Sequence, residues 1–83
     1  MRALVIDDSR AMRMILKGIL TEAGFSVMEA ASVREGLERL REQGAPDLAL
    51  VDWNLPEQLG LAFVEAARAD HANDGMRIMM VTT

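Results

Sequence analysis

The chain of 83 residues contains no cysteine, so neither a disulfide framework nor a thiolate zinc site can stabilise it. It also lacks any apolar run near the roughly 20 residues that a membrane-spanning helix requires. Basic residues are scarce, 9 against 13 acidic ones, and the net charge of −4 argues against broad nucleic-acid binding. Asp7 and Asp8 interrupt the apolar start of the chain, unlike a signal peptide. We therefore expect one small cytoplasmic domain, residues 1–83, without a membrane segment.

Four short apolar runs are typical of buried β-strands. They are residues 3–6, 25–30, 48–51 and 77–81, of which 25–30 is more polar and is expected at a sheet edge. Stretches with a helical pattern separate these runs, and this alternation is typical of βαβ units that form a parallel sheet. We therefore expect an α/β fold with a doubly wound parallel sheet.

Three helices are expected between the strands. The first begins at Ser9 and ends at Gly24, and the second begins at Ser32 and Glu35, which have the spacing of a capping box. The apolar face of the first helix is expected to comprise Met12, Ile15, Leu16, Ile19 and Leu20. The apolar face of the third is expected to include Leu61, Val64 and Ala67. A polar stripe of Arg10, Arg13 and Lys17 on the first helix is expected to face solvent.

Acidic residues follow two of the expected strands directly. Asp7 and Asp8 come after the first strand, and Asp52 comes after the third. If these strands are neighbours, the three carboxylates converge at one rim of the sheet, where they repel one another unless a cation binds. Oxygen ligands of this kind suit Mg²⁺. Taken separately, Asp7 and Asp8 could cap a helix and Asp52 could form a turn, but their combination favours a magnesium site.

Several segments resemble the receiver domain of two-component response regulators, of the chemotaxis-protein type. They are residues 4–9 (LVIDDS), 31–37 (ASVREGL), 50–56 (LVDWNLP) with Gly60 after it, and 80–83 (MVTT). The resemblance implies a flavodoxin-like fold with strand order 2-1-3-4. It also implies a C-terminally truncated receiver that lacks the fourth helix, the fifth strand and the fifth helix, together with the lysine that the family carries after its fifth strand.

The resemblance implies a role for each residue at the acidic rim. Asp52 would accept a phosphoryl group from the phosphohistidine of a sensor histidine kinase or a phosphotransfer protein. Asp8 and Asp52 would bind Mg²⁺ directly, Asp7 would bind it through water, and the backbone carbonyl of Asn54 would add a ligand. Thr82 would donate a hydrogen bond to the phosphoryl group and act as the switch. The chain would then be a signalling domain of a phosphorelay rather than an enzyme.

The resemblance also implies where partners bind and what the truncation removes. Arg10 and Met14, on the first helix, would contact the phosphodonor. Lys17 lies two turns into that helix and cannot replace the absent family lysine, so we expect impaired phosphorylation. Leu59 occupies a position where the family commonly has a short polar residue, which leaves the capping of the third helix in question.

An alternative is a receiver-derived interaction module that transfers no phosphoryl group. In strand order 2-1-3-4, strand 77–81 lies at an edge, and Ile15 and Ile19 lack a packing partner. We therefore expect a homo-oligomer that forms through strand 77–81. Met79 and Met80, in a strand of the buried type, are expected to fill the core.

Overall fold

Four parallel strands form a single sheet in the computed structural model, which describes residues 1–81. The strands are β1 (Arg2–Ile6), β2 (Ser26–Ala30), β3 (Leu48–Asp52) and β4 (Arg77–Val81). The helices are α1 (Arg10–Glu22), α2 (Val33–Gln43) and α3 (Gly60–Arg68), followed by the short 3-10 helix η1 (His71–Asn73). The strand order β2-β1-β3-β4, with every pair parallel, confirms the expected doubly wound α/β fold.

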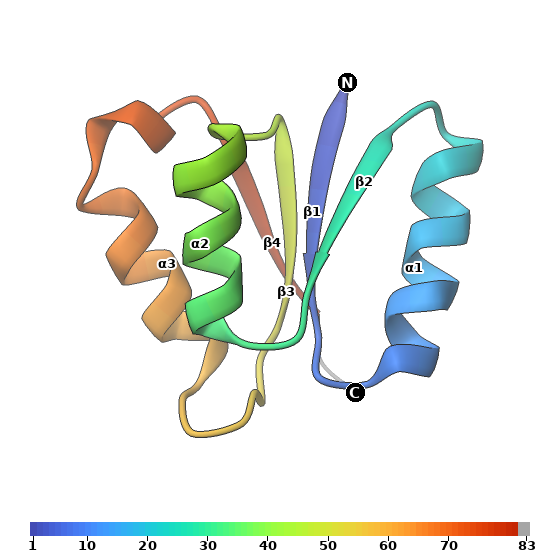
Figure 1. Ribbon diagram of the computed structural model, residues 1–83, viewed down its shortest axis with the longest axis horizontal. Coiled ribbons are helices and arrows are strands. Elements are labelled where there is room, and N and C mark those ends of the chain that lie inside the picture. Colours follow the sequence, from blue (N-terminus) through green and yellow to red (C-terminus); the bar gives the residue numbers. More distant parts are fainter. Residues whose placement is uncertain (82–83) are drawn as a thin grey trace.

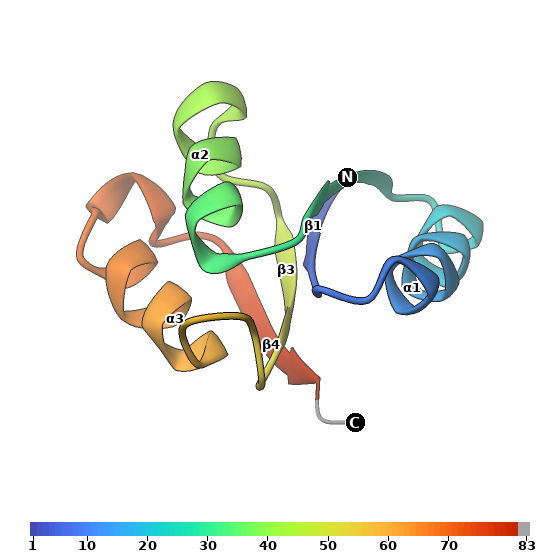
Figure 2. The same ribbon diagram turned by 60° about the horizontal axis from the view of Figure 1, so that its bottom comes forward.

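The helices cover the two faces of the sheet unequally (Figures 1 and 2). Helix α1 lies on one face, over β1 and β2, while α2 and α3 lie on the other. The chain therefore leaves β1 toward one face and leaves β3 toward the opposite face. In open α/β sheets, such a divergence between neighbouring strands opens a crevice at their carboxyl ends, where ligands bind.

The larger part of the core lies between the sheet and helices α2 and α3. Its fully buried side chains include Leu4, Ile6, Val51, Phe63 and Met76. On the opposite face, α1 buries Leu20 against the sheet, while Ile15 and Ile19 are exposed, as the sequence predicts. No helix within residues 1–81 is long and apolar enough to cross a membrane.

The helix boundaries follow from local hydrogen bonds. The Ser9 hydroxyl accepts from the backbone N–H of Met12 at the start of α1, and the Ser32 hydroxyl accepts from Glu35 at the start of α2, both at 3.2 Å. The Glu35 carboxylate accepts from the N–H of Ala31, so the second half of the capping box reaches one residue further back than usual. Helix α3 begins after Leu59 without a side-chain cap.

One expectation for α3 was wrong. Leu61 is exposed, whereas Phe63 and the expected Ala67 are almost completely buried. Phe63 and Ala67 are four residues apart and share the face toward the sheet, whereas Leu61 is about 200° away around the helix axis.

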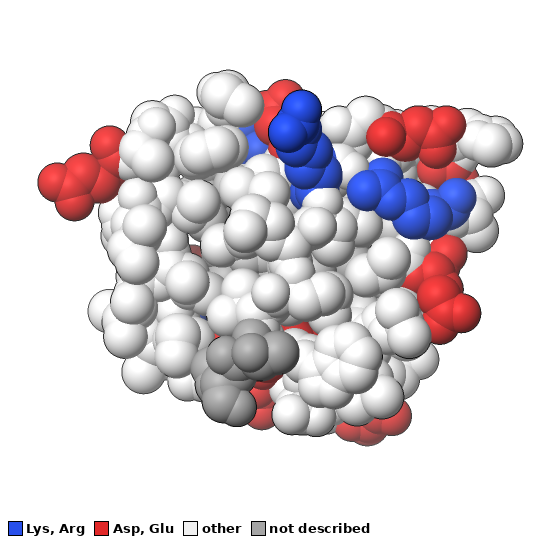
Figure 3. All heavy atoms as spheres, turned by 180° about the vertical axis from the view of Figure 1, so that it is seen from behind, with Lys and Arg blue, Asp and Glu red and all other residues white. Residues whose placement is uncertain are grey.

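The expectation that Met79 fills the core was also wrong, because its side chain is 58% exposed. Met79 pairs with Leu50 and points to the face that carries α1, but α1 lies over β1 and β2 and does not reach β4. Met80 points to the opposite face and packs against the larger core. Seen from the side of β4, the surface has few charged side chains at its centre (Figure 3).

Candidate metal centre

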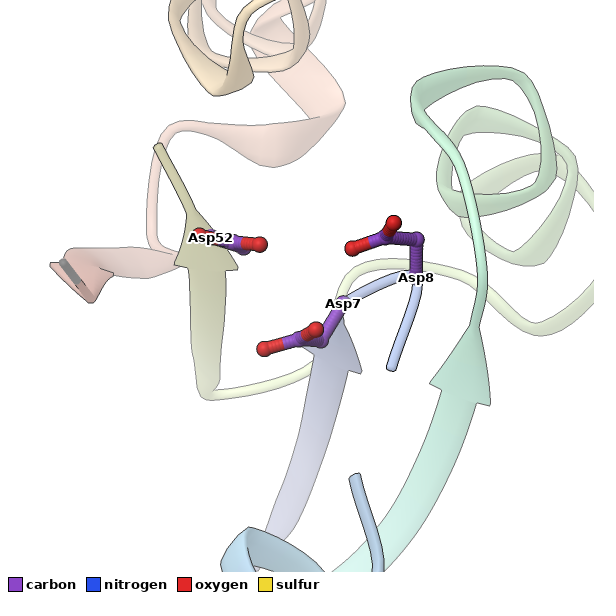
Figure 4. Close-up of side chains that lie close together, drawn as sticks. All are labelled: Asp7, Asp8 and Asp52. Carbon is purple, nitrogen blue, oxygen red and sulfur yellow. The ribbon is translucent and has the colours of Figure 1, made fainter. Parts of the chain in front are cut away.

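The ends of β1 and β3 bring three carboxylates together. Ile6 and Val51 are paired across the two strands, so Asp7 and Asp52 follow at the same level of the sheet, and Asp8 comes next in the loop. One carboxylate oxygen from each residue lies within 4.8 Å of the other two. Figure 4 shows all three side chains pointing into a common space. The convergence predicted from the sequence is therefore present.

The main chain and side chain of Asp7 are held by three hydrogen bonds. Its N–H donates to the carbonyl of Ala30 at 3.1 Å, and its Oδ1 accepts from the N–H of Ser9 at 2.9 Å. Its own carbonyl accepts from Nη1 of Arg13 at 2.6 Å. Because Asp7 is buried and its N–H, carbonyl and Oδ1 all form hydrogen bonds, its position within the cluster is fixed.

Asp52 is buried at the end of β3, and its Oδ1 accepts from the N–H of Asn54 at 3.3 Å. Burial raises the pKa of the Asp52 carboxyl above 3.8, and the charges of Asp7 and Asp8 add to this rise. The backbone N–H groups of Asn54 and Trp53 lower the same pKa, but the net direction is upward. Asp52 therefore carries its negative charge at a free-energy cost.

The three carboxylates of the acidic cluster form no ion pair within the described residues. Among residues 1–81, no lysine or arginine side chain forms an ion pair with Asp7, Asp8 or Asp52. Three converging carboxylates without a counter-ion favour binding of a hard divalent cation.

The residues present fit a magnesium ion. Two oxygen ligands on opposite sides of Mg²⁺ are about 4.2 Å apart, because each lies about 2.1 Å from the ion. Ligands on adjacent sides of the ion are about 3 Å apart. One carboxylate oxygen from each residue lies within 4.8 Å of the other two, so the cluster is close to the size of such a coordination shell. Asp8 is exposed, which leaves the cluster open to solvent.

Other residues singled out in the sequence lie at different places. The N–H of Asn54 contacts Asp52, so its main chain is at the cluster, whereas Thr82 lies outside the described residues 1–81. Arg10 and Met14 are exposed on α1 and line a groove of about 910 Å³ between α1 and α2. Lys17 forms an ion pair with Glu29 of β2 at 3.4 Å and does not contact the cluster.

For two residues near the cluster, the sequence did not show the contact that they make. Arg13 was expected to face solvent, but its side chain is only 16% exposed and contacts the Asp7 carbonyl and Glu29. Its spacing on α1 does not distinguish it from Arg10 and Lys17. Gly60 begins α3, and a β-carbon there would overlap the carbonyl oxygen of Asp52. The sequence shows the glycine, but not this close approach.

Sequence comparison matches residues 3–83 to the family model of the response regulator receiver domain. Over its whole length the chain is 39% identical to the chemotaxis protein CheY1 of Helicobacter pylori and covers 68% of that protein. It is 40% identical to a CheY homolog of Campylobacter jejuni and covers 65% of it. The chain thus spans about two thirds of the length of these curated relatives.

Solved structures show the same fold. A CheY-like receiver domain protein from Methanospirillum hungatei superposes with a TM-score of 0.87 at 37% identity, over 98% of this chain and 62% of that one. A response regulator from Burkholderia pseudomallei, solved with a phosphorylated aspartic acid, a calcium ion and citrate, gives 0.82 at 27% identity, over 98% and 46%. From the family match and these identities, we conclude that the chain belongs to the response regulator receiver domain family.

Proposed function

We propose that this chain is a phosphoacceptor in two-component signalling, in which Asp52 takes a phosphoryl group from a phosphohistidine while the cluster holds Mg²⁺. The observation that carries the proposal is the convergence of Asp7, Asp8 and Asp52 without a cationic partner among residues 1–81. The Burkholderia relative, whose structure contains a phosphorylated aspartic acid and a calcium ion, supports the same chemistry.

Asp52 is the best candidate for the nucleophile. A carboxylate oxygen of Asp52 attacks phosphorus, an O–P bond forms as the P–N bond breaks, and the departing imidazole nitrogen keeps the electron pair of that bond. Asp7 is less suited because it is held more tightly: its Oδ1 accepts from the Ser9 N–H at 2.9 Å, whereas Oδ1 of Asp52 accepts from the Asn54 N–H at 3.3 Å. Bound Mg²⁺ would be held by Asp8, Asp52 and the Asn54 carbonyl, with Asp7 acting through water, and would neutralise charge on the phosphoryl oxygens.

The first test is phosphorylation by a small phosphodonor such as acetyl phosphate with Mg²⁺, measured by intact mass. We expect one phosphate-sized adduct on the unchanged protein and none on Asp52→Asn. An adduct that persists in Asp52→Asn would assign the phosphoacceptor elsewhere. If the unchanged protein forms no adduct, the proposal fails.

We further propose that a sensor histidine kinase or phosphotransfer protein contacts Arg10 and Met14. Both are exposed in the first half of α1, close in sequence to the acidic cluster, and Met14 is 63% exposed. Substituting both with alanine should slow phosphoryl transfer from a protein donor and leave the reaction with acetyl phosphate unchanged. Equal loss with both donors would contradict a docking role.

A second candidate function is self-association through β4. Among residues 1–81, β4 pairs only with β3, and its Met79 is exposed on the same face of the sheet as α1, where Ile15 and Ile19 are exposed. The few charges at the centre of this side of the molecule (Figure 3) are consistent with contact between two copies. This function requires no phosphoryl transfer and is compatible with the first.

A further inference from the structure

We infer that Arg13 is a positioning residue for the acidic cluster, which it sets through the backbone between Asp7 and Asp8. The inference rests on the proposed magnesium site. Arg13 forms no hydrogen bond or ion pair with the three carboxylates, so its effect on metal binding acts through the main chain or through its charge.

The contacts of Arg13 connect the loop after β1 to the edge strand β2. Its Nη1 donates to the Asp7 carbonyl at 2.6 Å, and its Nε donates to Oε1 of Glu29 at 3.3 Å. Glu29 also pairs with Lys17 at 3.4 Å, and its backbone carbonyl accepts from Nε of Arg39 at 3.2 Å. The planar guanidinium of Arg13 is therefore held by Glu29, which is itself bound by one residue of α1 and one of α2.

The Asp7 carbonyl matters because it belongs to the same peptide plane as the N–H of Asp8. This plane is rigid, so a hydrogen bond that fixes the carbonyl also fixes the direction in which the Asp8 main chain leaves it. Within residues 1–81, the exposed Asp8 carboxylate accepts no hydrogen bond of its own. The position of this carboxylate opposite Asp52 (Figure 4) thus depends on the backbone that Arg13 holds.

Two effects of Arg13 on metal binding have opposite signs. As a nearby positive charge, Arg13 opposes binding of a cation, and its removal should strengthen Mg²⁺ binding. As a positioning residue, it holds the ligands in place, and its loss should weaken binding, as loss of outer-shell partners commonly does by about 10–100-fold. Weaker Mg²⁺ binding after removal of Arg13 therefore indicates the positioning effect, and tighter binding indicates the charge effect.

The test compares Arg13→Gln and Arg13→Lys by calorimetric titration with MgCl₂. We expect both variants to bind Mg²⁺ about tenfold more weakly or worse, because a lysine keeps the charge but cannot hold both acceptors with a planar fork. Lys17→Gln is the control, since it removes the other ion pair of Glu29 without touching the Asp7 carbonyl, and should bind Mg²⁺ normally. Unchanged affinity in both Arg13 variants, or tighter binding in Arg13→Gln with Arg13→Lys unchanged, overturns the inference.

Urea unfolding without Mg²⁺ shows whether each variant folds. If the Arg13 variants do not, Glu29→Gln replaces them, because it weakens the anchor of Arg13 while leaving its contact with Asp7. We expect a smaller loss of Mg²⁺ affinity in Glu29→Gln, and normal affinity there would count against the inference. Failure of the proposed magnesium site is distinguishable, because the unchanged protein itself then takes up no Mg²⁺. Failure of phosphoryl transfer alone leaves the unchanged protein with normal Mg²⁺ binding and without a phosphate adduct.

Discussion

Gly60 packs against the main-chain carbonyl of Asp52 so closely that a β-carbon at position 60 would overlap the carbonyl oxygen. The N–H of Gly60 also donates to the carbonyl of Trp53 at 2.8 Å. Gly60, the first residue of α3, thus lies against the main chain of both Asp52 and Trp53. Any side chain at position 60 must push the helix away from the end of β3.

We therefore predict that Gly60→Ala lowers the free energy of unfolding by about 1–3 kcal/mol, the usual cost of overpacking. The matched control is Gly18→Ala in α1, where an added β-carbon meets nothing within 4 Å. Because glycine within a helix is less favourable than alanine, this control should gain about 0.5–1 kcal/mol. Urea unfolding measures both changes, and the same sign for the two variants would contradict the prediction.

The raised pKa of Asp52 predicts how stability depends on pH. The folded protein holds the Asp52 proton more tightly than the unfolded chain, whose pKa is near the ordinary 3.8. This contribution to stability is fully present below pH 3.8 and is lost as the pH rises through the folded pKa. At neutral pH the ionised Asp52 therefore destabilises the fold.

Asp52→Asn should consequently be more stable than the unchanged protein at pH 7, by about 0.5–2 kcal/mol. The difference in stability should shrink as the pH falls toward about 3.5, because the Asp52 carboxyl is then protonated and as neutral as the asparagine amide. Urea unfolding at both pH values measures this. Glu65→Gln, on the exposed side of α3, is the control, and its effect should stay within about 0.5 kcal/mol. A less stable Asp52→Asn at pH 7 would contradict the prediction.

Trp53 offers a direct signal from the metal site. It is the one tryptophan of the chain, follows Asp52 directly, and has an exposed side chain. Its backbone N–H donates to the carbonyl of Val81 at 3.0 Å, which fixes its main chain beside the cluster. We predict that its fluorescence changes on addition of Mg²⁺ and that Asp52→Asn abolishes the change. No response in the unchanged protein, or the same response in Asp52→Asn, would remove support for a metal site here.

The sheet and the acidic cluster could be predicted from the sequence because local features define both. The two central strands are uninterrupted apolar runs, and an aspartate follows or ends each one, so the run and its end are visible in the sequence. Parallel pairing then places Asp7 and Asp52 at one rim without further information. The two N-terminal serine caps are local for the same reason, since each hydroxyl reaches a backbone N–H three residues later.

The errors arose where burial depends on neighbours distant in sequence. Arg13 has the spacing of a solvated residue, and only the position of Glu29 on β2 makes it a buried partner. Met79 has the apolar sequence neighbours of a buried strand, but α1, which covers this face of the sheet over β1 and β2, does not reach β4. In α3, Phe63 rather than Leu61 faces the sheet. This helix carries apolar residues on several sides, so its sequence does not determine which side turns toward the sheet.

The exposed Met79 allows self-association to be tested with a close control. Met79 is 58% exposed on β4, and Met14 is 63% exposed on α1, so lysine at either position changes charge and apolar area similarly. We expect the unchanged protein to form dimers at micromolar concentration in light-scattering measurements. Met79→Lys should weaken the dimer at least about tenfold, because burial of such a side chain contributes about 1.5–3 kcal/mol, whereas Met14→Lys should have no effect. A monomeric unchanged protein, or equal dissociation in both variants, would show that β4 is not the interface.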